Sequence, residues 1–181
     1  MRFLLFLIFF CFFDARSMNL LNSVDMSKNT QSNEWVLITD NVMGGVSEGE
    51  LKIISDDKKF FRLEGTVSTK NNGGFIQFRS LFNLNENDFS GIKFTARGNN
   101  QTYFVHVRTK YTFLPWQYYS GKFNVNKDWD IKTLDFMDFE KSNFYQPGTF
   151  DSSEITSIAF VAFGRDHDVK LDILNAELVK K

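Results

Sequence analysis

From Trp35 onward, apolar and polar residues alternate with a period of two through most of the chain. In GIKFTARG (91–98), for example, Ile92, Phe94 and Ala96 are each separated by one polar residue. Successive side chains of a β-strand point to opposite faces, so this alternation is typical of half-buried strands. The pattern therefore predicts a chain built from strands.

Ten such runs are separated by turn signals rich in Gly, Asn and Asp, such as Gly44-Gly45 and the stretch 71–74. The expected strands are 34–39, 50–55, 59–69, 74–82, 91–97, 102–109, 117–125, 129–136, 154–163 and 168–178. Many short strands with such turns favour an antiparallel sandwich or barrel. The longest connection, 137–153, is expected to cross between two sheets.

The N-terminus predicts a targeting segment. Arg2 is followed by the uninterrupted apolar run 3–13, which is shorter than the roughly 20 residues that a membrane-spanning helix needs. A basic start, a short apolar run and small residues before a cleavage point indicate a signal peptide over 1–17 and an exported protein. The alternative is an N-terminal membrane anchor. Residues 18–33 are expected to be a polar tether, and 34–180 to form one domain.

Composition narrows the classes of function. The formal net charge is −1, so the chain lacks the clustered positive charge on which nucleic-acid binding depends. The single cysteine, Cys11, lies in the expected signal peptide, which leaves the exported domain without a disulfide or a thiol nucleophile. We predict no nucleic-acid partner and no cofactor.

The stretch 35–47, WVLITDNVMGGVS, has the composition of a tight corner. Adjacent glycines permit positive φ angles or close approach of the backbone to another segment. Asp40 and Asn41 are suited to bonding local backbone amides. Met43 is expected to fill a gap at the edge of the core.

The same stretch resembles the signature of the complex I intermediate-associated protein 30 family. A second motif, NNGGF at 71–75, and later residues follow in the expected order, so that the resemblance covers about 34–178. The motif residues are Trp35, Asp40, Asn41, Met43, Gly44, Gly45 and Ser47, followed by Asn72, Gly73, Gly74 and Phe75.

The resemblance implies a single galactose-binding-like jelly-roll β-sandwich without an established catalytic site. It also implies a chaperone or assembly factor that binds a protein client, with respiratory-complex subunits as candidate partners. Because a signal peptide is expected, a general protein-binding module fits the chain better than a strictly respiratory role. We expect the glycine motifs to be structural, and a ligand-binding role for Asp40, Asn41 and Ser47 stays open.

Four basic residues lie on three consecutive predicted strands: Arg79, Arg97, His106 and Arg108. If these strands pair in sequence, the side chains line one sheet face and form a site for an acidic glycan or another carboxylate, which an arginine binds through two hydrogen bonds. The alternative is a solvated face with cross-strand ion pairs to acids such as Glu64.

Aromatic residues crowd the stretch 109–119, TKYTFLPWQYY. The candidate contacts for a sugar ring or a partner protein are Tyr111, Phe113, Trp116 and Tyr118, because large aromatic rings bury much area with few torsions. The alternative is a corner that covers the core with Trp116 turned inward.

The sequence predicts neither a metal site nor a catalytic centre. Three adjacent residues such as Asp166–Asp168 cannot easily face one ion, so a turn is expected there. The two histidines, His106 and His167, stand outside any nucleophile motif. We therefore predict a non-catalytic protein-binding module, with a secreted carbohydrate-binding module as the alternative.

Overall fold

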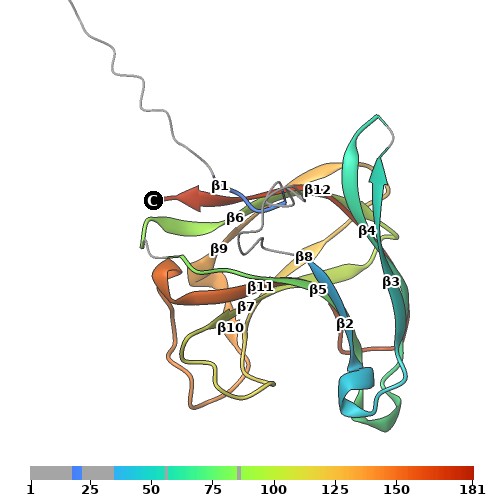
Figure 1. The fold of residues 1–181 in the computed structure, drawn as a ribbon, viewed down its shortest axis with the longest axis horizontal. Coiled ribbons are helices and arrows are strands. Elements are labelled where there is room, and N and C mark those ends of the chain that lie inside the picture. Colours follow the sequence, from blue (N-terminus) through green and yellow to red (C-terminus); the bar gives the residue numbers. More distant parts are fainter. Residues whose placement is uncertain (1–17, 22–34, 56, 85–86) are drawn as a thin grey trace, which may run out of the picture.

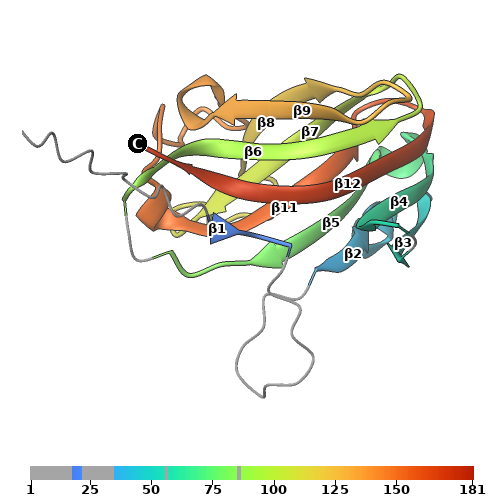
Figure 2. The same cartoon turned by 90° about the horizontal axis from the view of Figure 1, so that it is seen from above.

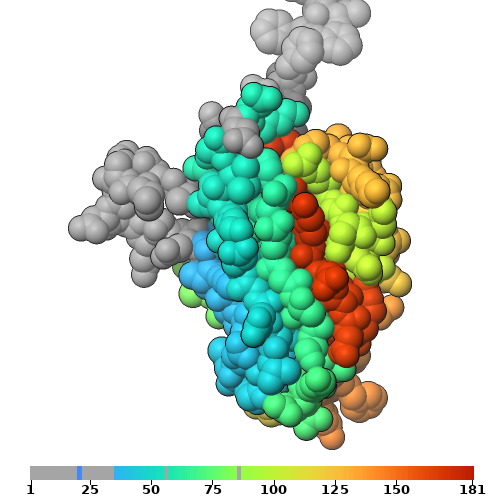
Figure 3. All heavy atoms as spheres, turned by 90° about the vertical axis from the view of Figure 1, so that its right-hand side faces the viewer, coloured from blue at the N-terminus to red at the C-terminus, as the bar shows by residue number. Residues whose placement is uncertain are grey.

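Two antiparallel sheets of six strands each face one another in a computed structural model that describes residues 18–21, 35–55, 57–84 and 87–181 (Figures 1 and 2). The first sheet, which we call sheet A, is formed by β3 (Glu48–Ser55), β4 (Lys59–Val67), β12 (His167–Lys180), β6 (Phe89–Gly98) and β9 (Asp130–Asp135), with β1 (Met18–Asn19) paired to β12. Figure 3 shows β3, β4 and β12 as adjacent bands on the surface.

The second sheet, sheet B, is formed in order by β10 (Glu140–Lys141), β8 (Tyr119–Asn124), β7 (Thr102–Thr109), β11 (Ile155–Phe163), β5 (Phe75–Leu81) and β2 (Val36–Thr39). The described helices are four short 3-10 turns, η1 (Asp40–Met43), η2 (Lys70–Asn72), η3 (Phe136–Asp138) and η4 (Ser152–Glu154). The expected all-β jelly-roll sandwich is therefore confirmed. None of the helices in the described ranges is long and apolar enough to cross a membrane.

All ten predicted strands are present, with ends shifted by a few residues. The crossing expected in 137–153 is also confirmed, because β9 belongs to sheet A whereas β10 and β11 belong to sheet B. β10 was not predicted, since its two charged residues carry no apolar alternation. The expected signal peptide, 1–17, lies outside the described residues.

Aromatic rings fill the space between the sheets. Trp35 packs on Phe78 with a centroid separation of 5.3 Å, and Phe160 lies 5.1 Å from both Phe78 and Phe94. Trp35 directly precedes β2, and the three phenylalanines occupy inward positions of β5, β11 and β6. All four side chains are buried. Because rings at such separations interact favourably beyond their buried area, they anchor the two sheets to each other.

The tether prediction is wrong for residues 18–21, which belong to the sandwich. Met18 and Asn19 pair with Leu178 and Glu177 of β12. Leu20 is buried at 1 % exposure, and its carbonyl accepts a hydrogen bond of 3.2 Å from the Trp35 indole N–H. An apolar pair, Leu20 and Leu21, gains by leaving water, which outweighs the polar character of the neighbouring sequence. The remainder of the expected tether, 22–33, lies outside the described residues.

The two glycine motifs meet around one buried carboxylate. Asp40 is fully buried, and its oxygens accept hydrogen bonds from the Ser47 N–H (2.9 Å), the Ser47 hydroxyl (2.5 Å), the Gly74 N–H (2.5 Å) and the Phe75 N–H (3.3 Å). Burial opposes ionisation, but these hydrogen bonds outweigh it, and the pKa of Asp40 is lowered. Asp40 therefore joins the 40–47 corner to the 73–75 corner, which lie together beside β2 in Figure 1.

The glycines are required by this arrangement in two ways. A Cβ atom on Gly45 would lie 2.3 Å from Asp40 Cγ, and one on Gly73 would lie 2.4 Å from an Asp40 oxygen. Gly44 and Gly74 have φ angles of +87° and +129°, which side chains disfavour. The two glycine motifs thus meet in a structural joint around Asp40.

The prediction that Met43 fills a gap at the edge of the core is wrong. Its side chain is 59 % exposed, and its neighbour Val42 is 73 % exposed. The 3-10 turn η1 directs Asp40 inward and leaves the following residues in solvent. Asn41 is exposed as well, and its backbone N–H bonds the Thr39 hydroxyl at 3.4 Å.

Candidate binding face

The outer face of sheet B contains a hollow, because its central strand carries small residues. Ser157 and Ala159 of β11 point away from the core, whereas Ile158 and Phe160 between and beside them point into it. Ala159 is flanked directly by Arg79 on β5 and by His106 on β7. Because the Ala159 side chain is short and its neighbours Arg79 and His106 are long, a pocket of about 60 Å³ remains above β11.

The pocket is lined by Gln77, Arg79, His106, Arg108, Pro115, Tyr118, Ser157 and Ala159. Three of the four predicted basic residues are therefore brought together. Tyr118, which the sequence assigned to the aromatic platform, also belongs here. Its ring stacks on the His106 ring with a centroid separation of 4.0 Å and an angle of 12°.

His106 is an uncharged, incompletely bonded group in this pocket. Its side chain is buried, and burial lowers its pKa to about 3. The imidazole is therefore neutral at pH 7. Its Nε2 atom is buried without a hydrogen-bond partner among the described residues. Buried polar groups are normally paired, so this nitrogen has an unmet capacity for one hydrogen bond.

Arg79 and Arg108 differ in their hydrogen-bond partners. One Nη atom of Arg108 donates to the carbonyl oxygens of Thr112 at 2.8 Å and Leu114 at 3.1 Å, which fixes the β7–β8 loop over the pocket. Burial and the neighbouring charge of Arg79 lower the pKa of Arg108. The Nε atom of Arg79 is buried and, within the described part of the chain, has no partner.

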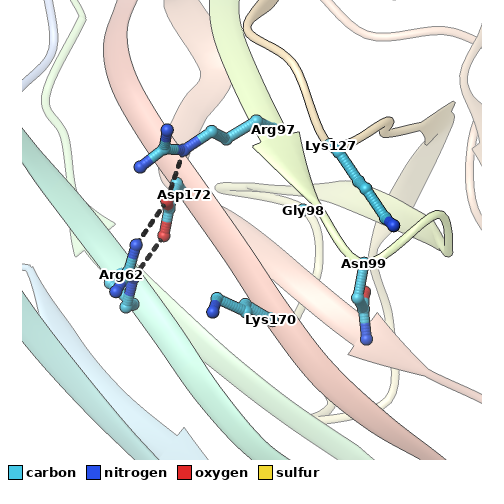
Figure 4. Close-up of a pocket in the computed structure, with 7 residues that line it drawn as sticks. All are labelled: Arg62, Arg97, Gly98, Asn99, Lys127, Lys170 and Asp172. Atoms are coloured by element: carbon cyan, nitrogen blue, oxygen red, sulfur yellow. Dashed lines mark hydrogen bonds and ion pairs between the residues drawn. The ribbon is translucent and has the colours of Figure 1, made fainter.

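Arg97 does not join this cluster, so that part of the prediction is wrong. It lies on β6 in sheet A, because β5, β6 and β7 do not pair in sequence: β5 and β7 both pair with β11. Figure 4 shows Arg97 and Arg62 on either side of Asp172, which accepts hydrogen bonds of 2.8 Å and 2.7 Å from their Nε atoms. Arg97 also lies over the Trp129 ring at 4.4 Å.

Charges are matched on the outer face of sheet A. Lys93 pairs with Glu177 and Lys132 with Asp130, at 3.4 Å and 2.6 Å. Glu64 lies within 4.0 Å of basic groups on its own and both neighbouring strands. The predicted alternative, cross-strand ion pairs, therefore describes Arg97 and its sheet, but not the sheet B pocket.

Exposed aromatic side chains project from two loops next to the pocket. In the β7–β8 loop the exposed fractions are 46 % for Tyr111, 79 % for Phe113 and 55 % for Trp116. In the β10–β11 loop they are 85 % for Phe144 and 88 % for Tyr145. The alternative in which Trp116 turns inward is wrong, because more than half of its side chain is exposed. Arg108 fixes the backbone two residues earlier through the Leu114 carbonyl.

Hydrogen bonds tie these two loops together below sheet B (Figure 1). The Ser142 hydroxyl donates to the Trp116 carbonyl at 2.8 Å and accepts from the Tyr118 N–H at 3.0 Å. The Gln146 side-chain amide donates to the Tyr118 carbonyl at 3.1 Å. The two loops are therefore joined to each other. We call them, with their exposed residues Tyr111, Phe113, Trp116, Phe144 and Tyr145, the aromatic loops. Sequence reasoning missed Phe144 and Tyr145, although two adjacent aromatic residues in the longest polar connection were a usable signal.

Side chains suited to metal binding do not converge in the part of the chain that the structure describes. No group of three or more His, Cys, Asp or Glu residues there is placed to hold a metal ion. Asp166 instead accepts hydrogen bonds from the Thr69 N–H and hydroxyl, at 2.6 Å and 2.7 Å. Asp166 thus fixes a turn beside η2.

The fold places the protein in the class of two-sheet jelly-roll sandwiches that includes carbohydrate-binding modules. The family 11 module of the cellulosomal cellulase Lic26A-Cel5E of Clostridium thermocellum superposes with a TM-score of 0.71 at 16 % identity, over 92 % of this chain and 96 % of that one. A family 11 module from the same organism in complex with a β-1,3-1,4-mixed-linked tetrasaccharide gives 0.67 at 15 % identity, over 91 % and 94 %. A family 4 module gives 0.55 at 18 % identity, over 91 % and 95 %.

Residues 24–173 match the family of complex I intermediate-associated protein 30, and the chain belongs to that family. The resemblance inferred from the two glycine motifs is thereby confirmed. The comparison with curated proteins gives no match. Fold similarity at such low identity establishes the architecture and leaves function to the site itself.

Proposed function

We propose that the protein is a non-catalytic module that binds a partner protein and holds it during assembly of a larger complex. The observation that carries the proposal is the surface of aromatic loops, where Phe113, Phe144 and Tyr145 are each at least 79 % exposed. Exposed apolar surface of this kind is typical of protein interaction sites. Membership of a family named for intermediates of complex I supports an assembly role.

The surface has the features of a protein interface. Aromatic residues with an arginine nearby are the residues that most often contribute large binding energies at interfaces. The loops are tied together through Ser142, so ordering them on binding costs less conformational entropy than it would for two free loops. We propose export through residues 1–17, with a client in the destination compartment. Respiratory-complex subunits are the alternative client.

The test is co-purification of the client with the full chain and with Phe113→Ser/Phe144→Ser. The matched control is Ile131→Ser, which alters a side chain that is 61 % exposed on the opposite sheet. We expect the double substitution to reduce client recovery at least about tenfold, since interface aromatics contribute about 2 kcal/mol or more. Equal recovery with all three proteins would contradict the proposal.

Carbohydrate binding is the second candidate function. It is favoured by the His106–Tyr118 stack on the outer face of a fold shared with carbohydrate-binding modules. A sugar ring would pack against Trp116 and hydrogen-bond in the pocket. Glycan-array binding that is lost in Trp116→Ala supports this function, whereas the absence of any glycan binding eliminates it.

A further inference from the structure

The two sheets contain comparable rows of basic residues across a central strand, and only one row is completed by an acid. In sheet A, Asp172 of β12 pairs in register with Arg62 on one side and Arg97 on the other. Its carboxylate bonds both guanidinium groups. In sheet B, the corresponding central position is Ala159, between Arg79 and His106.

The sheet B row therefore has donors without the acceptor that its counterpart contains. Arg108 lies two residues after His106 on β7, on the same face, and pairs with Ser157 of β11. The eight residues that line the pocket include no acid. Two buried nitrogens there, Arg79 Nε and His106 Nε2, have no partner among the residues described. A pocket of about 60 Å³ exceeds the roughly 15 Å³ that one water needs, so it has room for a small polar group.

We propose that the pocket formed by Arg79, His106 and Arg108 binds a carboxylate group from an acidic side chain of the partner protein. The carboxylate takes the place that Asp172 has in sheet A. It accepts hydrogen bonds from the Arg79 and Arg108 guanidinium groups and from His106, with the imidazole proton on Nε2. Charge-assisted bonds to arginine are among the stronger hydrogen bonds in proteins.

This inference rests on the proposed function, because the carboxylate is supplied by the partner protein. The pocket lies directly beneath the aromatic loops, where that partner would bind. Pro115 and Tyr118 line the pocket, and in the chain they lie one residue before and two residues after the exposed Trp116. A client that covers the aromatic loops would therefore bring its neighbouring residues to the pocket. The aromatic loops contribute area, and the pocket selects a client with a correctly placed Asp or Glu.

The test is a titration of the full chain with sodium acetate, followed by NMR of arginine Nε–H and histidine ring nitrogens, with sodium chloride at equal ionic strength as reference. We expect saturable shifts of Arg79 Nε and His106 Nε2, and a loss of acetate affinity of about tenfold or more in Arg79→Gln. The matched control, Lys93→Gln, removes one charge from sheet A and should bind acetate as the natural chain does. Unchanged backbone amide spectra establish that each variant is folded.

Shifts that do not saturate would contradict the proposed carboxylate site. Shifts of His106 Nε2 that persist unchanged in Arg79→Gln would also contradict it. A second titration compares a short glutamate-rich peptide with glucuronic acid. Tighter binding of the peptide supports a protein partner, and tighter binding of glucuronic acid would overturn that assignment. Because the acetate titration needs no client, its failure is distinguishable from failure of the protein-binding function.

Discussion

Replacing Gly45 by Ala would place a methyl carbon where the Asp40 side chain now lies. The added Cβ would be 2.3 Å from Asp40 Cγ, which is about 1.2 Å closer than the ordinary contact between two carbon atoms. Asp40 cannot withdraw freely, because its oxygens accept four hydrogen bonds of 2.5 to 3.3 Å. Loss of two such bonds to a charged group costs about 3–6 kcal/mol.

Gly44→Ala provides the matched comparison one residue earlier. No atom lies within 4 Å of the Cβ position at Gly44, so its cost comes only from the positive φ angle and should be about 1–2 kcal/mol. Urea denaturation of both variants measures the difference. Equal destabilisation would show that close approach to Asp40 is not what requires Gly45.

A double-mutant cycle isolates the contact itself. Asp40→Gly is the suitable partner change, because an alanine would retain a Cβ atom only 2.7 Å from the Cβ added at position 45. In the Asp40→Gly background, Gly45→Ala should cost about 1 kcal/mol or less, which gives a coupling energy of at least about 2 kcal/mol. Additive free energies would refute the account of the two glycine motifs as a joint around Asp40.

Three further predictions concern stability. The pKa of His106 is about 3 in the folded chain and 6.5 in a free histidine, so the unfolded chain binds more protons between these two pH values. The free energy of unfolding should therefore fall by up to about 1.4 kcal/mol for each pH unit below pH 6.5. Urea denaturation at each pH measures this slope, which should be less steep in His106→Phe. Asp172→Ala should cost about 2 kcal/mol in thermal denaturation, since two partly buried arginines lose their shared carboxylate; an unchanged melting temperature would contradict this. Leu20→Ala should cost about 2–3 kcal/mol in the same assay if residues 18–21 are packed in solution as the structure describes, and no change would show that they are not.

The strands were predictable because a half-buried strand must alternate its side chains. The joint around Asp40 was predictable in part: adjacent glycines indicated close approach, but not which group they approach. That group is Asp40 itself, and two of the four hydrogen bonds that hold it come from Gly74 and Phe75, which lie 34 and 35 residues away in the sequence. Met43 was misplaced because an isolated apolar residue in a turn has no periodicity from which its direction can be inferred.

The binding face was only partly predictable, because the sequence does not specify which strands become neighbours. Arg79 and His106 lie on opposite sides of β11, a strand that follows them by more than 45 residues, whereas Arg97 lies in the other sheet. The pocket also depends on Ala159, whose importance comes from its small size in the paired sheet. Such cross-strand rows become visible only when the strand order is known.

The central claim is that a partner protein binds on sheet B and its aromatic loops. Photo-crosslinking in the native compartment tests it most directly, with a photoreactive amino acid placed at Phe144 in one full-length variant and at Ile131, on sheet A, in another. The account predicts a discrete protein adduct from position 144 that is absent from position 131. An adduct formed equally from both positions, or only from position 131, would contradict it.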